Sequence, residues 1–270
     1  RAYGFLASRY RPGDKIFLLG YSRGAFAARS LAGVIDRVGL LKAEHSEERN
    51  IRTIYRLYEA DHKDEKLNHF VHSHCHESAS IEMVGVWDTV KALGVRLPIL
   101  WRWSAPNHEF HNHDLGRSIR HGFHALARDE TRSAYEPVLW VCPEDWQGRI
   151  EQVWFPGAHG DVGGQLSGFE PARALANIPL VWMLERLESC GLILPDNWRM
   201  RYEQNPHAPS VSTWRGFGKL FLIRKRRNIV CGSCESLHHS VFAREQRRPP
   251  RPENGATARL LQRWRRADRA

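Results

Sequence analysis

The motif GYSRG at 20–24 constrains the fold of this 270-residue chain more than any other feature. A short apolar run, KIFLLG at 15–20, precedes the motif, and its lack of alternation is typical of a strand buried on both faces of a mainly parallel sheet. The residues that follow, AFAARSLAGVIDRVGLL, repeat apolar side chains at helical spacing. Strand, tight turn and helix in this order place Ser22 on a sharp turn, as a nucleophile requires, and favour glycine on both sides of it.

A serine hydroxyl is a poor nucleophile unless a base takes its proton and a third group orients that base. Two later strand ends supply candidates for these roles. Asp88 ends the apolar run IEMVGVW, 66 residues after Ser22, and His159 follows RIEQVWF, 71 residues further on. We therefore predict Ser22 as nucleophile, Asp88 as orienting acid and His159 as base. The backbone N–H of Arg23, at the start of the helix, is the expected donor to an oxyanion.

Other residues could fill these roles. Asp161 could be the acid, or it could support the triad without belonging to it, although its place in DVGG is typical of a turn. Seven further histidines lie in an expected helix, a polar loop or a basic region, and none directly follows a convincing strand: His121, His124, His72, His74, His76, His238 and His239. The cluster HSHCH at 72–76 and the lone CxxC of Cys231 and Cys234 lack a second ligand group. We expect neither a metal nor an organic cofactor.

The remaining pattern predicts further elements. Residues 47–60, 115–128 and 173–191 have helical patterns, 137–142 has a strand pattern, and 61–79 is expected to be a loop. The apolar segment 93–114, without clear periodicity, is a candidate cover for a pocket. No apolar run is long enough to span a bilayer, and the first residues, RAYGFLASRYRPGDK, lack the pattern of a signal peptide, so we expect neither a membrane span nor a signal peptide. Five cysteines, an odd number, favour a reducing compartment, so we expect a cytoplasmic protein, with export by a dedicated secretion system left open.

The net charge of +10 is concentrated near the C-terminus. Residues 199–270 hold 17 Lys+Arg against 5 Asp+Glu, whereas the rest of the chain holds 23 against 25. Such a block is either a solvated tail or a site that attracts anionic lipid headgroups or nucleic acid. We expect an anionic membrane surface rather than nucleic acid as the partner. The Pro/Arg-rich stretch 246–270 is predicted to be a linker and a short helix.

Three segments in order, GYSRGA, GVWDTV and FPGAHGDVGG, resemble the α/β-hydrolase domain of the phospholipase effectors of bacterial type VI secretion and their uncharacterised relatives. The resemblance covers roughly residues 1–245. It implies an α/β-hydrolase-like fold, a mainly parallel sheet with helices on both faces, and a triad of Ser22, Asp88 and His159. Family members carry the first sheet strands and an Asp-Gly-Thr loop upstream of the nucleophile. We expect these N-terminal strands, and the second oxyanion donor, to be missing here.

The activity that the resemblance implies is hydrolysis of carboxylic esters, in particular the acyl esters of lipids or phospholipids. Two alternatives stay open from the sequence. One is a hydrolase of a non-lipid ester or a thioester. The other is a catalytically silent module whose basic C-terminus binds a membrane or nucleic acid.

Overall fold

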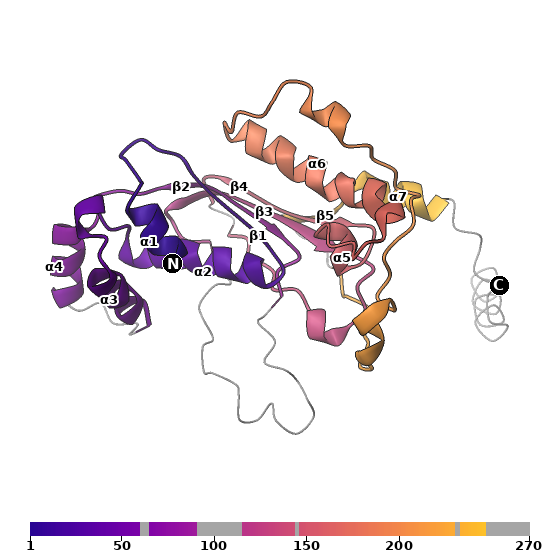
Figure 1. Cartoon of the computed structure of the whole chain (residues 1–270), viewed down its shortest axis with the longest axis horizontal. Coiled ribbons are helices and arrows are strands. Elements are labelled where there is room, and N and C mark those ends of the chain that lie inside the picture. Colours follow the sequence, from indigo (N-terminus) through magenta and orange to yellow (C-terminus); the bar gives the residue numbers. More distant parts are fainter. Residues whose placement is uncertain (60–64, 91–114, 144–145, 230–232, 247–270) are drawn as a thin grey trace, which may run out of the picture.

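The computed structural model describes residues 1–59, 65–90, 115–143, 146–229 and 233–246 (Figure 1). The candidate pocket cover at 93–114 therefore lies entirely outside the described residues. So do Cys231 and the predicted linker and helix at 247–270.

The described chain forms one five-stranded sheet in which every pair of neighbouring strands is parallel. The strands lie in sequence order: β1 (Ile16–Tyr21), β2 (Ile81–Trp87), β3 (Ile119–Ala127), β4 (Arg149–Phe155) and β5 (Glu235–Leu237). The α-helices are α1 (Ala2–Ala7), α2 (Arg23–Val38), α3 (Glu48–Glu59), α4 (Glu65–His74), α5 (His159–Val162), α6 (Arg173–Ser189) and α7 (His239–Gln246). Short 3-10 helices are η1 (Ala43–His45), η2 (Ser133–Tyr135), η3 (Glu170–Ala172), η4 (Trp198–Arg201) and η5 (Gly216–Leu220). The predicted α/β class with a mainly parallel sheet is confirmed.

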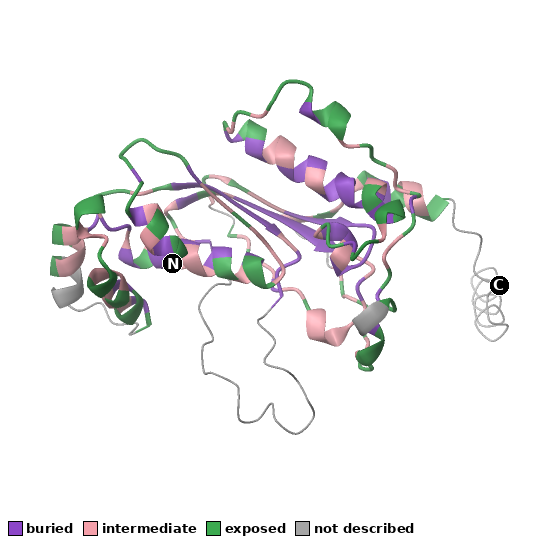
Figure 2. Cartoon of the chain, viewed as in Figure 1, coloured by how far each residue is buried: buried purple, intermediate pink, exposed green. Residues whose placement is uncertain are grey.

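Helices cover both faces of the sheet (Figure 1). On one face α2 packs against β1 and β2, and α1 and α3 pack beyond it around Val84, Val86 and other buried side chains. On the other face α6 packs against β3 and β4, with Phe123 and Phe155 between them. Figure 2 shows the central strands almost wholly buried. Helices on both faces leave the ends of the strands open, and the candidate site residues lie at these ends.

Three sequence predictions were wrong. Residues 119–127, expected in a helix, form β3, because the run IRHGFHALA lies between β2 and β4, where seven of its nine residues are buried. This tertiary environment outweighs its Ala and Leu content. Residues 137–142 form no strand, although Val138 and Trp140 are buried. Part of the expected loop 61–79 is α4.

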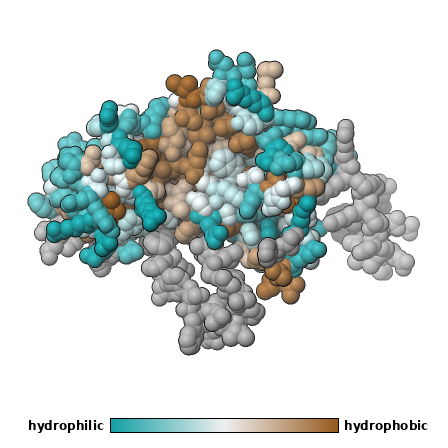
Figure 3. Space-filling view, viewed as in Figure 1, coloured by the Kyte–Doolittle hydropathy of each residue, from teal (hydrophilic) through white to brown (hydrophobic). Residues whose placement is uncertain are grey.

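The edge of β1 opposite β2 is apolar and exposed to solvent in the described part of the chain. A groove of about 670 Å³ runs along β1 and α2, lined by Phe17, Leu19 and Leu31 among others. Leu19 keeps 46% of its surface exposed. Figure 3 shows hydrophobic surface between α2 and α6, where β1 lies in Figure 1. β1 is thus an edge strand of the described sheet, paired only with β2.

The cysteines differ from the sequence prediction. Cys142 and Cys234 form a disulfide, contrary to the prediction from the odd cysteine count, whereas Cys75 and Cys190 are free and buried. Cys234 lies beside β4, where its carbonyl oxygen accepts the N–H of Gln152. Among the described residues, no helix combines the length and apolarity needed to cross a membrane.

Candidate active site

Ser22 lies on the turn between β1 and α2. Its φ of 57° and ψ of −121° belong to a region that residues other than glycine rarely adopt, so the backbone is strained at this position. A Cβ atom on Gly20 would lie 2.4 Å from the carbonyl oxygen of Gly24, which explains why glycine is required there. A Cβ on Gly24 itself would meet nothing within 4 Å. Steric constraints therefore require glycine at position 20 but not at position 24.

The structure brings together the three residues predicted for nucleophile, acid and base. Ser22 Oγ lies 2.8 Å from Nε2 of His159, and Nδ1 of His159 lies 2.5 Å from Oδ2 of Asp88. An ionised carboxylate can only accept, so Nδ1–H donates to Asp88 and Nε2 is left to accept the Ser22 hydroxyl proton. The three residues follow β1, β2 and β4, so their proximity depends on the parallel order of the sheet.

Asp88 is completely buried at the end of β2. Its backbone N–H donates to Ala125, and its Oδ1 accepts the N–H of Ala127 at 2.9 Å, so two residues of β3 position it. Burial alone would raise the pKa of Asp88, but the charge of Arg227 and the hydrogen bonds from His159 and Arg227 hold it well below its usual range. Asp88 is therefore a carboxylate at neutral pH. The sequence did not point to Arg227.

His159 begins α5 and is enclosed by aromatic and charged neighbours. Its ring centroid lies 4.7 Å from that of Tyr21 and 4.8 Å from that of Tyr135. Its backbone N–H donates to the buried carboxylate of Glu130 at 3.2 Å. A Cβ on Gly163 would lie 1.9 Å from the Tyr21 ring, so glycine is needed for this ring to reach His159. His159 is therefore fixed by packing as well as by its hydrogen bonds.

Asp161 and His124, two of the alternative candidates for the acid and the base, make other contacts. Asp161 accepts the N–H of Ala158 and the hydroxyl of Ser210, as expected for a turn carboxylate. His124 is completely buried in β3, and burial lowers its pKa to about 3. Its Nε2 accepts the backbone N–H of Thr89, so it supports the loop after Asp88.

The remaining candidate residues do not form a shared site in the described part of the chain. Among the described residues, no three His, Cys, Asp or Glu side chains are grouped to hold a metal ion. Within the HSHCH segment, His74 stacks on Phe70, Cys75 is buried and His72 is exposed. His238 packs against Phe155.

A cavity of about 650 Å³ opens beside Ser22 and His159. Its lining is polar for a lipid site and includes three arginines, Arg23, Arg132 and Arg215. Arg132 is paired with Glu130 through two hydrogen bonds at 2.8 and 2.7 Å. In the described part of the chain, neither Arg23 nor Arg215 has an acidic partner. This cavity can therefore favour a negatively charged group near Ser22.

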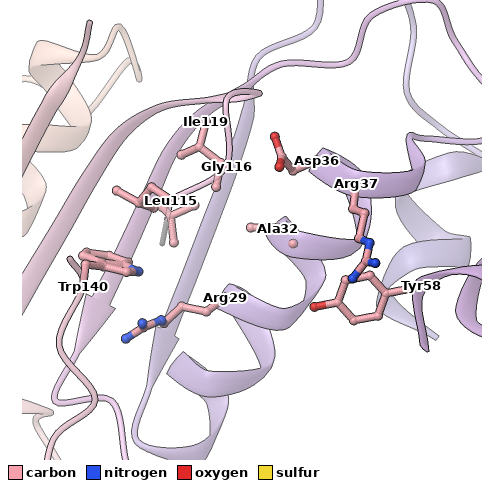
Figure 4. A pocket seen from close by; sticks show the side chains of 11 residues that line it. Arg29, Ala32, Asp36, Arg37, Tyr58, Leu115, Gly116, Ile119 and Trp140 are labelled. Atoms are coloured by element: carbon pink, nitrogen blue, oxygen red, sulfur yellow. The ribbon is translucent and has the colours of Figure 1, made fainter. Parts of the chain in front are cut away.

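A second, smaller cavity of about 220 Å³ lies beside α2, away from Ser22 (Figure 4). In it the Arg29 side chain extends toward Trp140, with the guanidinium carbon 4.9 Å from the ring centroid. Arg29 also donates to the carbonyl oxygen of Val138. Burial lowers the pKa of Arg29 to about 9. This cavity includes none of Ser22, Asp88 and His159.

Comparisons with known proteins agree with this fold. Residues 1–186 match the family model described as type VI secretion system phospholipase effector Tle1-like, catalytic domain. An uncharacterized protein of Saccharomyces cerevisiae is 28% identical over 151 residues, which is 52% of this chain and 20% of that protein. The chain thus spans about a fifth of the length of this curated relative. No solved structure gave a significant match. Because the family model covers more than half of the sequence, the chain belongs to the Tle1-like phospholipase effector catalytic domain family.

Proposed function

We propose that the chain is a serine hydrolase that cleaves the acyl esters of phospholipids, with Ser22 as nucleophile, His159 as base and Asp88 as orienting acid. The observation that carries this proposal is the continuous line of hydrogen bonds from Ser22 Oγ through both ring nitrogens of His159 to Asp88. Membership of a family of phospholipase effectors supports the choice of a lipid ester.

In this reaction Ser22 Oγ attacks the ester carbonyl carbon while Nε2 of His159 takes the hydroxyl proton. The tetrahedral intermediate collapses to an acyl-enzyme, and the leaving alcohol receives the proton from His159. A water molecule then attacks the acyl-enzyme with His159 again as base, which releases the fatty acid and restores Ser22. Asp88 keeps Nδ1 of His159 in the donor tautomer throughout.

The oxyanion of the intermediate needs donors near Ser22. Arg23 is the first residue of α2, and N–H groups in the first turn of a helix have no acceptor within the helix. We assign the backbone N–H of Arg23 as one such donor. Removing a single oxyanion donor typically costs about 10²- to 10³-fold in kcat, so this contact is a substantial part of the proposal.

The experiment that tests the proposal is labelling of the full-length protein with a fluorophosphonate, which reacts with activated serines. We expect one modified residue, Ser22, and loss of labelling in His159→Ala. The same protein should release fatty acid from phospholipid vesicles. A folded protein that neither reacts with the probe nor releases fatty acid would instead favour the catalytically silent module.

The arginines of the cavity give a prediction about substrate choice. Arg215 is exposed, lines the cavity and lies over Phe169, with its guanidinium carbon 4.1 Å from the ring centroid. If it contacts the lipid phosphate, Arg215→Ala should raise KM for a phospholipid about tenfold. Hydrolysis of an uncharged short-chain ester should hardly change. Arg201→Ala, which removes an exposed arginine of η4, is the matched control, and equal effects of both variants on KM would refute the phosphate contact.

The type of ester and the limits of the domain also belong to the proposal. Profiling of acyl-chain length would distinguish phospholipid hydrolysis from cleavage of a non-lipid ester or thioester. We propose a hydrolase domain over 1–245 and binding of an anionic membrane through 246–270, a region that lies outside the described residues except for its first position.

A further inference from the structure

Arg227 reaches the candidate active site from a segment far from it in sequence. It follows η5 in a stretch without helix or strand and lies beyond the residues 1–186 that match the family model. Its side chain is nevertheless only 5% exposed. Nη1 lies 2.5 Å from Oδ1 of Asp88, and Nη2 lies 2.9 Å from Oδ2. A guanidinium that contacts both oxygens of a carboxylate fixes its plane as well as its position.

The same guanidinium is held by two backbone carbonyl groups. Nη1 donates to the carbonyl oxygen of Ala127 at 2.7 Å, and Nη2 donates to that of Tyr135 at 2.5 Å. Ala127 in turn donates its N–H to Oδ1 of Asp88. Arg227 thus connects the end of β3, the turn at η2 and the acid after β2. These are the segments that surround His159.

We propose that Arg227 is a positioning residue, which holds the carboxylate of Asp88 so that Oδ2 faces Nδ1 of His159. This inference rests on the proposed function, because it assigns Asp88 the role of orienting acid. Each oxygen of Asp88 has two donors: Oδ1 accepts from Ala127 and Arg227, and Oδ2 accepts from His159 and Arg227. Without Arg227, rotation of the carboxylate would be restrained by only two hydrogen bonds.

Charge gives Arg227 a second effect. Asp88 is completely buried, and the titratable groups that face it are Arg227, His159, Tyr21 and His124. Arg227 and His159 lower the pKa of this carboxyl group, whereas burial raises it. Loss of Arg227 therefore moves the pKa of Asp88 upward, toward the pH at which the enzyme works. A protonated Asp88 no longer stabilises the imidazolium that forms during the reaction.

The test compares Arg227→Met, Arg227→Lys and the control Arg226→Met in the full-length protein. Arg226 is the neighbouring, exposed arginine. Ester hydrolysis and the rate of fluorophosphonate labelling at Ser22 are measured across pH. We expect Arg227→Met to lower kcat about 10- to 100-fold with little change in KM, the range typical for partners of catalytic ligands. The acid limb of the pH profile should move to higher pH.

The result that would overturn the inference is a folded Arg227→Met variant with wild-type kcat and an unmoved acid limb. If this variant fails to fold, Arg227→Lys decides, because it keeps the charge and loses the two-point contact. A folded Lys variant with lower kcat supports the inference, and one identical to wild type overturns it. Absence of labelling in the wild-type protein would instead contradict the proposed function itself, so the two failures are distinguishable.

Discussion

Ser22→Ala should lower kcat for ester hydrolysis by about 10⁵- to 10⁶-fold, the largest effect expected for any substitution in this chain. The reason is that His159 Nε2, 2.8 Å from Ser22 Oγ, would have no hydroxyl to deprotonate. The fold should be unaffected, since alanine at the same turn removes only the oxygen. The measurement is single-turnover and steady-state hydrolysis of a phospholipid and of an activated ester.

Ser8→Ala is the matched control, because Ser8 is exposed at the end of α1 and its hydroxyl contacts the carbonyl of Phe5. It should leave kcat unchanged. A Ser22→Ala protein that retains more than a few per cent of activity would show that another residue is the nucleophile.

Asp88→Asn has the second largest expected effect and acts on both activity and stability. We expect kcat to fall about 10⁴-fold, because the amide cannot hold His159 in the tautomer that accepts from Ser22. It also leaves the buried Arg227 without a counter-charge, which should lower the free energy of unfolding by about 3–5 kcal/mol. Hydrolysis assays and urea unfolding at pH 7 measure the two effects.

The stability effect of Asp88 has a defined dependence on pH. The pKa of this carboxyl group is lower in the folded protein than in the unfolded chain. Its contribution is therefore fully present above the unfolded value of about 3.9 and is lost as the pH falls through the lower, folded value. The difference between wild type and Asp88→Asn should shrink only in strongly acidic solution.

Two variants check the interpretation of Asp88→Asn. Asp14→Asn removes a charge from an exposed turn and should change neither kcat nor stability by much. Adding Arg227→Met to Asp88→Asn should recover part of the lost stability, because the unpaired buried charge is removed. A double variant less stable than Asp88→Asn alone would contradict the account of the pair.

The sequence predicted those elements whose pattern is local. β1, α2, β2, β4 and α6 each have an apolar run or a helical repeat, and four of them flank the predicted site. β3 escaped this reasoning because HGFHALA carries no alternation, and its burial depends on β2 and β4 at either side. Local pattern cannot report an environment that the rest of the chain creates.

The same difference between local sequence pattern and tertiary environment applies to the candidate site. Ser22, Asp88 and His159 could be selected because each follows a recognisable strand, and parallel strands bring their carboxyl ends to one edge. Arg227 is 139 residues from Asp88, in a stretch with four consecutive basic residues and no regular element. Nothing in that run distinguishes the buried arginine from its exposed neighbour Arg226. Only the tertiary structure separates them.

The sequence order of the strands also has a consequence for synthesis. Each strand pairs with the one made before it, so the sheet can grow in the direction of translation. Ser22 and His159 are 137 residues apart, which at typical translation rates corresponds to about 7 to 27 s. During this interval the nascent chain carries Ser22 without His159. Under the proposed mechanism, a ribosome-bound intermediate would therefore be inert toward esters until β4 and α5 have emerged.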